Sequence, residues 1–304
     1  MAIITTGNFA KALYPGVNSW FGKGYTEYVP EWPGLFESYI SRRNYEEDVF
    51  ITSFGLASVK PEGEAVTYDS ERQGFITRYT HVVYALGFLV TREAVEDDLY
   101  DIVAARKATG LAFSMRQTKE TVASNIYNRA FNSSYTGGDG LELCSTAHVN
   151  VAGGTWANEL TTAADLSESA LEQACIDISK WTNDRGLKIA VMPKSLVIPT
   201  DLQFEAERIL KTPYRPGTAD RDINALYQMS KIPGGYHVNH YLTDADAWFL
   251  RTNLPEDGMK HYQRRPLRFA VDNDFDTENA KFKADERYVF GWTDPRALFG
   301  SPGG

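Results

Sequence analysis

The stretch TREAVEDDLYDIVAARKATGLAFSMRQTKETVASNIYNRAFN, from Thr91 to Asn132, decides how the rest of the chain is arranged. Thr91 can cap a helix, and the carboxylates that follow it complement the positive end of a helix dipole. Apolar residues then recur at helical spacing: Val95, Leu99, Ile102, Val103, Met115, Val122 and Ile126. An uninterrupted helix here would be about 60 Å long, against a mean of about 11–12 residues in globular proteins. The sequence therefore predicts a long helix, kinked at Gly110, that supports the other layers.

The composition indicates a soluble protein kept in a reducing compartment. The chain has 304 residues, and its 31 basic and 40 acidic side chains give a net charge of −9. An acidic chain without a long basic run is a poor candidate for a dedicated nucleic-acid reader. No apolar run reaches about 18 residues and no signal peptide is visible, so neither a membrane span nor secretion is expected. Cys144 and Cys175 are typical of free thiols.

The first 45 residues are predicted to form an arm. Glycine and proline, as at Pro15, Gly16, Gly22 and Gly24, punctuate this segment too often for long helices. Its many aromatic rings, however, are unlike a disordered tail. The favoured expectation is that the arm lies on a neighbouring subunit, and the alternative is that it packs on its own body.

A long antiparallel hairpin is predicted next. The runs Phe50–Phe54 and Phe75–Val83 have the β-branched and aromatic bias of strands, and the polar segment Val66–Gly74 lies between them. Because an isolated hairpin is only marginally stable, a projecting one should be braced by a partner. A hairpin folded against its own domain remains the alternative.

Behind the long helix, a second body is expected to begin near Asp165. Ser167 is a plausible helix cap, and Leu187–Met192 is predicted to be a buried strand stopped by Pro193. A further helix is predicted over Leu202–Leu210. The polar, proline- and glycine-broken segment Lys211–Gly235 is predicted to be a loop that is mobile or ordered by a partner. Strands are expected at Ala247–Leu250, Leu267–Val271 and Phe282–Trp292.

The search for chemistry predicts no catalytic, cofactor-binding or metal-binding residues. His237 and His240 lack the helical i, i+4 spacing and the intervening Glu of a zinc enzyme, so surface or structural roles are favoured. Cys144 and His148 lie too close in a turn to form an aligned dyad. The acidic run Asp272–Glu278 lacks the glycine and glutamate that an EF-hand requires, which favours a solvated turn. Neither a phosphate loop nor a nucleophile elbow is present.

The order of these segments resembles the major capsid proteins of tailed phages. More narrowly, Asp139–His148 (DGLELCSTAH) and Gly153–Asn158 (GGTWAN) look like a segment of the Mu-like major head subunits, and Glu96–Tyr100 is similar to that family too. Val149 stands where the family pattern usually has proline, which is a departure from the narrower family.

The resemblance implies an α+β fold, the tailed-phage major capsid fold, in five parts. These are an N-terminal arm (1–47), an extended hairpin loop (48–90), a peripheral domain built on the long spine helix (91–164), an α/β axial domain (165–271), and closing strands of the peripheral domain with the C-terminus (272–304).

The implied function is that of a structural major capsid protein rather than an enzyme. Such subunits assemble into hexamers and pentamers of an icosahedral head that encloses double-stranded DNA without sequence-specific binding. The partners implied are other copies of the chain, a separate scaffolding protein, a portal and a decoration protein, with assembly in the cytoplasm of a host bacterium and a final place in the virion. Scaffolding is assigned to a separate protein because no charged helical domain precedes the arm. Two alternatives stay open: an encapsulin-like compartment shell and a cytoplasmic enzyme whose site escaped the motif search.

Overall fold

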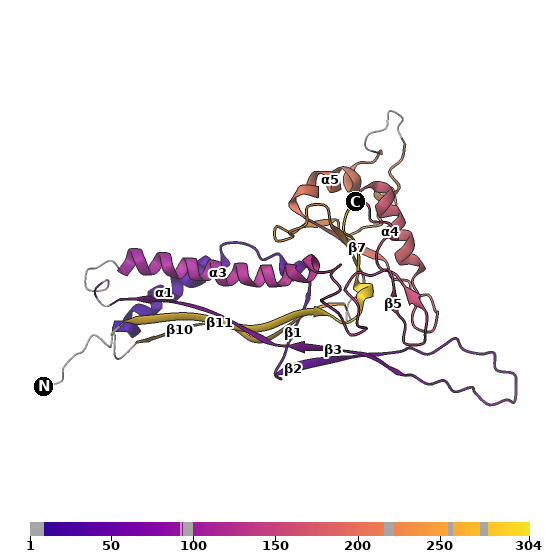
Figure 1. Cartoon of the computed structure of the whole chain (residues 1–304), viewed down its shortest axis with the longest axis horizontal. Coiled ribbons are helices and arrows are strands. Elements are labelled where there is room, and N and C mark those ends of the chain that lie inside the picture. Colours follow the sequence, from indigo (N-terminus) through magenta and orange to yellow (C-terminus); the bar gives the residue numbers. More distant parts are fainter. Residues whose placement is uncertain (1–8, 92, 94–99, 216–221, 255–257, 274–278) are drawn as a thin grey trace.

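The computed structural model describes residues 9–91, 93, 100–215, 222–254, 258–273 and 279–304. Figure 1 shows an elongated limb on one side and a compact body on the other, with a hairpin that runs beneath the body and projects beyond it. The described part of the chain begins toward the free end of the limb, and the C-terminus lies in the body.

The limb is a long sheet covered by the predicted long helix. The helix, α3, spans Tyr100–Asn128, and the sheet order is β1-β10-β11-β4. Along α3, Leu111 and Met115 pack with Phe269 and Phe282 of the sheet in one buried cluster. The helix prediction is confirmed from Tyr100 onward, while residues 92 and 94–99 lie outside the described part. Helix α3 continues through Gly110 without interruption, so the predicted kink is not found there. The strands are β1 (Glu37–Ile40), β10 (Met259–Asn273), β11 (Ala280–Trp292) and β4 (Val82–Val90).

Helix α1 (Phe9–Thr26) corrects the prediction that the arm holds no long helix. It packs along α3, and Phe21 is buried with its ring 4.8 Å from that of Phe269. A Cβ atom at Gly24 would lie 3.1 Å from the Thr109 side chain, so the glycine lets the two helices approach closely. Tertiary packing along α3 therefore outweighs the low helix propensity of the glycines.

The rest of the described arm also packs on its own body. The backbone N–H groups of Glu31 and Trp32 both donate to the Glu120 carboxylate on α3, at 3.0 Å. Downstream of the turn η2 (Trp32–Gly34), Phe36 is buried and β1 pairs in parallel with β10. The alternative expectation, that the arm packs on its own body, is therefore confirmed for these residues, and contact with a neighbouring subunit stays a prediction.

A hairpin is found as predicted, but its strands differ from those expected. The first strand ends at Ile51, so most of the expected strand Phe50–Phe54 lies in a loop, and the expected strand Phe75–Val83 is divided between two strands. Strands β2 (Tyr45–Ile51) and β3 (Gln73–Thr80) pair antiparallel, with Asp48 opposite Thr77. The chain then passes directly into β4, which leaves the hairpin and joins the long sheet against β11. The intervening residues 52–72 extend the hairpin as a loop without strand pairing.

The compact body is a second four-stranded sheet, order β12-β9-β7-β8, with helices packed on it. Helix α4 begins where predicted, because the Ser167 side chain accepts a hydrogen bond from the Ala170 N–H. Leu171 and Ile178 of α4 and Trp248 of β9 are fully buried together. The strands are β12 (Leu298–Ser301), β9 (Trp248–Thr252), β7 (Pro193–Ile198) and β8 (Tyr236–Val238), and the helices are α4 (Glu168–Lys180), α5 (Gln203–Lys211) and α6 (Ala225–Gln228).

Two predictions for this body need correction. The central strand β7 begins at Pro193, whereas the expected strand Leu187–Met192 is irregular and includes Ala190 at φ 51°. Proline is tolerated as the first residue of a strand because it need not donate there. The segment Lys211–Gly235 contains the short helix α6, and residues 216–221 lie outside the described part.

None of the helices in the described ranges is long and apolar enough to cross a membrane.

Candidate assembly surfaces

The root of the hairpin is held to the long sheet by a polar network around Asp48 on β2. Its carboxylate accepts hydrogen bonds from Lys260 at 2.6 Å, from Thr293 at 2.7 Å and from the Tyr262 hydroxyl at 3.1 Å. The Lys260 side chain is 7% exposed and that of Asp48 20%. Burial opposes the charge of Asp48, but the hydrogen bonds from Lys260 and Thr293 outweigh it and lower its pKa. The root is therefore fixed within one chain.

The far end of the hairpin makes fewer contacts with its own chain than the root does. Arg185, in the loop after α4, pairs with Asp69 at 3.3 Å, and Asn183 donates to the Ser53 hydroxyl at 2.6 Å. Beyond these contacts the loop from Phe54 to Tyr68, here called the tip, is almost bare. Leu56, Val59 and Tyr68 are 85%, 93% and 92% exposed. Large apolar side chains gathered on an exposed extension mark a contact site for another molecule.

The hairpin is also acidic. Between residues 45 and 80 it holds seven carboxylates and three basic side chains: Glu46, Glu47, Asp48, Glu62, Glu64, Asp69 and Glu71 against Lys60, Arg72 and Arg78. Its root carboxylate is neutralised by Lys260, whereas Glu62 and Glu64 lie in the exposed tip. The tip therefore offers both apolar and negative side chains to a partner.

The long sheet has a basic outer face, opposite to α3. Alternate residues of β11, such as Phe282 and Tyr288, are buried toward the helix, and the residues between them point outward. The Asp285 carboxylate on this face lies 2.5 Å from Arg265 and 3.5 Å from Arg268. Among the described residues, the part of this face from Arg265 to Asp272 on β10 and from Lys281 to Arg287 on β11 holds five cationic side chains, Arg265, Arg268, Lys281, Lys283 and Arg287, and two carboxylates, Asp272 and Asp285. It is a positively charged strip on an acidic chain.

Two free edges and an apolar margin border this strip. Strand β4 is an outer strand of the sheet, and its Val82, Val83, Leu86 and Leu89 are about half exposed. An outer strand presents backbone N–H and C=O groups that can pair with another chain. The edge is therefore chemically suited to the end of an extended loop.

A buried polar cluster, here called the His148 cluster, joins Asp139, His148, Trp156 and Asn158. The Nδ1 atom of His148 lies 2.6 Å from the Asp139 carboxylate and Nε2 lies 3.0 Å from the Asn158 side-chain oxygen. Its ring stacks on Trp156 at 4.7 Å. All four residues come from the two motifs that resemble the Mu-like subunits, and the contacts between them were not predicted from the sequence.

The other residues considered for chemistry are scattered. Burial raises the pKa of the Cys144 thiol well above its usual range, and both ring nitrogens of His148 have other partners, so these two residues form no nucleophile pair. His240 is exposed and pairs with Glu31 at 2.7 Å. The pKa of His237 is lowered by burial and by Arg251. Of Asp272–Glu278, residues 274–278 lie outside the described part. Among the described residues no group of histidine, cysteine or carboxylate side chains could hold a metal ion.

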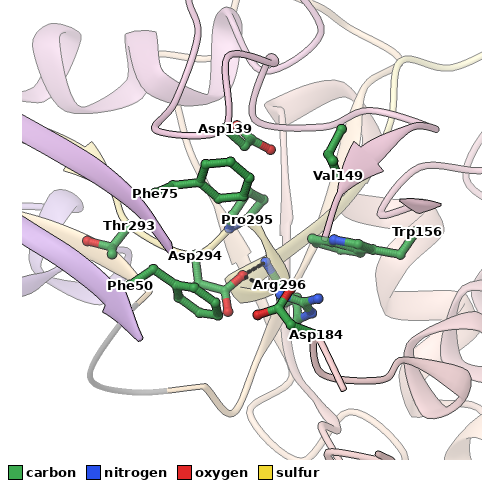
Figure 2. Close-up of a pocket in the computed structure, with 10 residues that line it drawn as sticks. All are labelled: Phe50, Phe75, Asp139, Val149, Trp156, Asp184, Thr293, Asp294, Pro295 and Arg296. Carbon is green, nitrogen blue, oxygen red and sulfur yellow. Dashed lines mark hydrogen bonds and ion pairs between the residues drawn. The ribbon is translucent and has the colours of Figure 1, made fainter. Parts of the chain in front are cut away.

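A narrow cleft lies where the hairpin meets the body (Figure 2). Phe50 and Phe75 enter it from the hairpin, and Asp139, Trp156 and Arg296 line it from the body. Its volume of about 20 Å³ has room for about one water molecule. The cleft is a seam between two packed parts rather than a substrate pocket.

Comparison with known proteins identifies the class to which this architecture belongs. A family model described as phage capsid protein matches residues 75–300. The match covers most of the chain, and the chain therefore belongs to this phage capsid protein family. It is a structural protein of the virion capsid, and no curated protein matches it.

Solved structures agree on the fold across nearly the whole chain. A virus-like particle from Pyrococcus furiosus is 14% identical, with 94% of this chain and 97% of that one covered and a TM-score of 0.55. The capsid of an empty GTA particle is 12% identical, with 88% of each chain covered and a TM-score of 0.53. The procapsid of bacteriophage JBD30 is 11% identical, with 95% of this chain and 75% of that one covered and a TM-score of 0.51. The mixed α+β capsid fold expected from the sequence is thus confirmed.

Proposed function

We propose that this chain is the repeating subunit of an icosahedral phage head, which forms hexamers and pentamers and encloses double-stranded DNA. Within that shell the hairpin is the bridging element, and its tip lies across the outer face of the long sheet of a neighbouring copy. The observation that carries this proposal is the exposure of the tip, where the side chains of Leu56, Val59 and Tyr68 are almost uncovered in the isolated subunit.

Charge complementarity supports the choice of the long sheet as the receiving surface. The tip is acidic, with Glu62 and Glu64, and the outer face is basic, with Arg268 and Lys283. The hairpin root of the same chain occupies only the near end of that face, where Asp48 binds Lys260. The hairpin of another copy would lie farther along the face, toward Lys281 and Lys283. Opposite charges would fix orientation and exclude wrong pairings more than they add affinity.

Many weak contacts suffice for such an assembly. Each copy offers one hairpin and receives one, so the contact is heterologous and can close into rings. Once part of a ring has formed, each further contact is effectively intramolecular and gains from a high effective concentration. A modest tip contact therefore yields a stable shell.

The remaining parts take roles within the same proposal. The segment Lys211–Gly235 would face the symmetry axis, where it would meet its equivalents in the axial domain (165–271). The arm (1–47), the hairpin loop (48–90) and the two peripheral segments (91–164 and 272–304) would build the rest of the shell. A separate scaffolding protein, a portal and a decoration protein are the further partners, and assembly takes place in the cytoplasm of the host. Membership of the Mu-like subfamily is part of the proposal and rests on the two motifs around His148.

A purely structural role, without catalysis, completes the proposal. The support for it is that the family is one of capsid proteins.

Electron microscopy of the purified chain, expressed alone and then with its genomic neighbours, tests this function. Closed shells, tubes or hexameric rings are expected. A homogeneous monomer or dimer under both conditions would contradict the proposal. Shells that form with protein cargo and without nucleic acid would instead support a compartment shell.

A further inference from the structure

The hydrogen bonds of the His148 cluster show which ring nitrogens of His148 carry a hydrogen. Asn158 donates from its side-chain nitrogen toward three carbonyl oxygens, those of Leu143 at 2.8 Å and of Pro295 and Leu298 at 3.1 Å. Its side-chain oxygen accepts the Ser145 N–H at 2.8 Å. A flipped amide would set oxygen against three oxygens, so the atom that faces His148 Nε2 is an acceptor. Nε2 must therefore carry a hydrogen.

The second ring nitrogen also faces an acceptor. Nδ1 lies 2.6 Å from one oxygen of Asp139, while the other oxygen of that carboxylate accepts the Leu141 N–H at 3.3 Å. A neutral ring already protonated on Nε2 would direct a lone pair from Nδ1 at an ionised carboxylate. Because both groups are buried, that repulsion would be costly. The pair is satisfied when the ring holds both protons and Asp139 is ionised.

Two loop segments that contain this pair also cradle the hairpin. A Cβ atom at Gly138 would lie 2.7 Å from the Thr77 hydroxyl and 3.2 Å from the Ile76 carbonyl oxygen on β3. One at Gly74 would lie 2.9 Å from the Val151 side chain, just beyond His148. The His148–Asp139 contact thus joins one support of the hairpin, the 137–139 turn, to the other, the 149–151 turn. Figure 2 shows Asp139, Val149 and Trp156 facing Phe75 across this seam.

We propose that His148 is a positioning residue for the hairpin, and that the proton it shares with Asp139 holds the two supporting turns together. With both ring nitrogens protonated, the two turns hold β3 in place and fix the angle at which the hairpin leaves the body. The inference rests on the proposed function only in taking the hairpin as the bridging element.

Other charged groups around the cluster do not replace that proton. Arg296 lies over Trp156 at 4.2 Å, but it is paired with Asp294 and also donates to Asn150. Asp184 accepts the Val151 N–H, and the pKa of Glu159 is raised by burial and by Glu142. The charged groups of the surrounding segments are thus Glu142, Glu159, Asp184, Asp294 and Arg296.

Asp139→Asn separates the shared proton from the contact itself. An asparagine keeps an oxygen for the Leu141 N–H and offers an N–H to a neutral Nδ1. The variant should therefore keep the geometry with a neutral ring, whereas His148→Gln removes the ring. Gly138→Ala, which forces the turn away from Thr77, is the positive control for a lost support.

The first measurement is a solid-state ¹⁵N spectrum of the full chain labelled at histidine. At pH 7 one of the five histidines should show two protonated ring nitrogens, and that signal should vanish in His148→Gln. In Asp139→Asn, the same ring should show one protonated nitrogen. A neutral His148 ring in the unmodified chain would overturn the proposal.

The second measurement is hydrogen–deuterium exchange of the 73–80 segment at pH 7. Protection in His148→Gln should fall at least about fivefold below that of the unmodified chain, in Asp139→Asn it should match the unmodified chain, and in Gly138→Ala it should be low. Equal protection in His148→Gln and in the unmodified chain, or an equal fall in Asp139→Asn, would overturn the coupling to the hairpin. The exchange is read on unassembled subunits, so its result is independent of whether shells form.

Discussion

The root and the tip of the hairpin lie on one pair of strands and loop, yet they are built in opposite ways. At the root, every oxygen of Asp48 has a partner in the same chain, and Tyr79 packs against Tyr262 with ring centroids 5.0 Å apart. At the tip, Leu56 and Val59 have almost no cover. This difference indicates that the contacts of the root stabilise the folded subunit, whereas the side chains of the tip make contacts between subunits during assembly. Variants should therefore divide into those that unfold and those that fold but fail to assemble.

The largest effect on folding is expected from Asp48→Asn. The change leaves the buried Lys260 ammonium without a counter-charge, and breaking a buried ion pair costs about 3–5 kcal/mol. Because Asp48 is partly exposed, a loss of about 3 kcal/mol is expected in urea unfolding of the unassembled subunit. Glu47→Gln, on the same strand but in an exposed pair with Arg78, is the matched control and should leave stability nearly unchanged. If both variants lost the same free energy of unfolding, the buried ion pair at the root would contribute no more to stability than the exposed pair on the same strand.

A smaller effect on folding is expected from acid. The pKa of Asp48 is lowered in the folded chain, so its contribution is present above the ordinary pKa of an aspartate, about 3.9, and is lost as pH falls through the lower folded value. The stability difference between the unmodified chain and Asp48→Asn should therefore shrink as the pH falls from 5 toward 2. Urea unfolding at several pH values measures it. A difference that stays constant would show that the charge of Asp48 does not stabilise the root.

Charge reversal of the hairpin arginines should impair assembly and leave the subunit folded. Arg78 pairs with Glu47 at 2.8 Å and stacks on Tyr45, both on the exposed surface, and Arg72 is exposed. In Arg78→Glu and Arg72→Glu, circular dichroism should stay that of the unmodified chain, while shell yield by sedimentation falls. Normal shells from both variants would mean that Arg72 and Arg78 make no contact between subunits that assembly requires.

The smallest effect on folding is expected at the tip. The double variant Leu56→Ser, Val59→Ser changes two exposed side chains, so the free energy of unfolding should stay within about 0.5 kcal/mol. Shell assembly should nevertheless be lost, as judged by sedimentation and electron microscopy. If the double variant assembled normally, the tip would be an ordinary exposed loop that makes no contact needed for assembly.

The sequence predicted the elements that have strong local signals. Ser167 caps α4 as expected, and the β-branched run that ends in β3 pairs with β2 as expected. Helix α1 was missed because its glycines lower local propensity, while its stability comes from packing on α3. Strand β7 was placed six residues early because Leu187–Met192 is apolar, whereas the left-handed φ of Ala190 interrupts it.

The assembly surfaces and the His148 cluster were less predictable. Aromatic rings in the arm suggested a neighbour, but Glu120 and the long sheet of the same chain bind that segment. His148 was weighed only against Cys144, the nearest nucleophile in sequence. Its partners are Asp139 and Asn158, nine and ten residues away, and only the closure of both turns brings them together. The only sequence feature that connected these three residues was that all of them lie in the two motifs that resemble the Mu-like subunits.

Cross-linking between copies tests the central claim most directly. Lys60 is the only lysine of the hairpin, and Lys283 lies on the exposed basic face of β11. Shells assembled from a mixture of ¹⁴N- and ¹⁵N-labelled chains would be treated with an amine-reactive cross-linker and analysed by mass spectrometry. A mixed-isotope peptide that joins Lys60 to Lys283 or Lys281 is predicted, because the tip of one copy lies on the long sheet of the next. Cross-links from Lys60 found only within one chain, or only to the compact body of another, would contradict the claim.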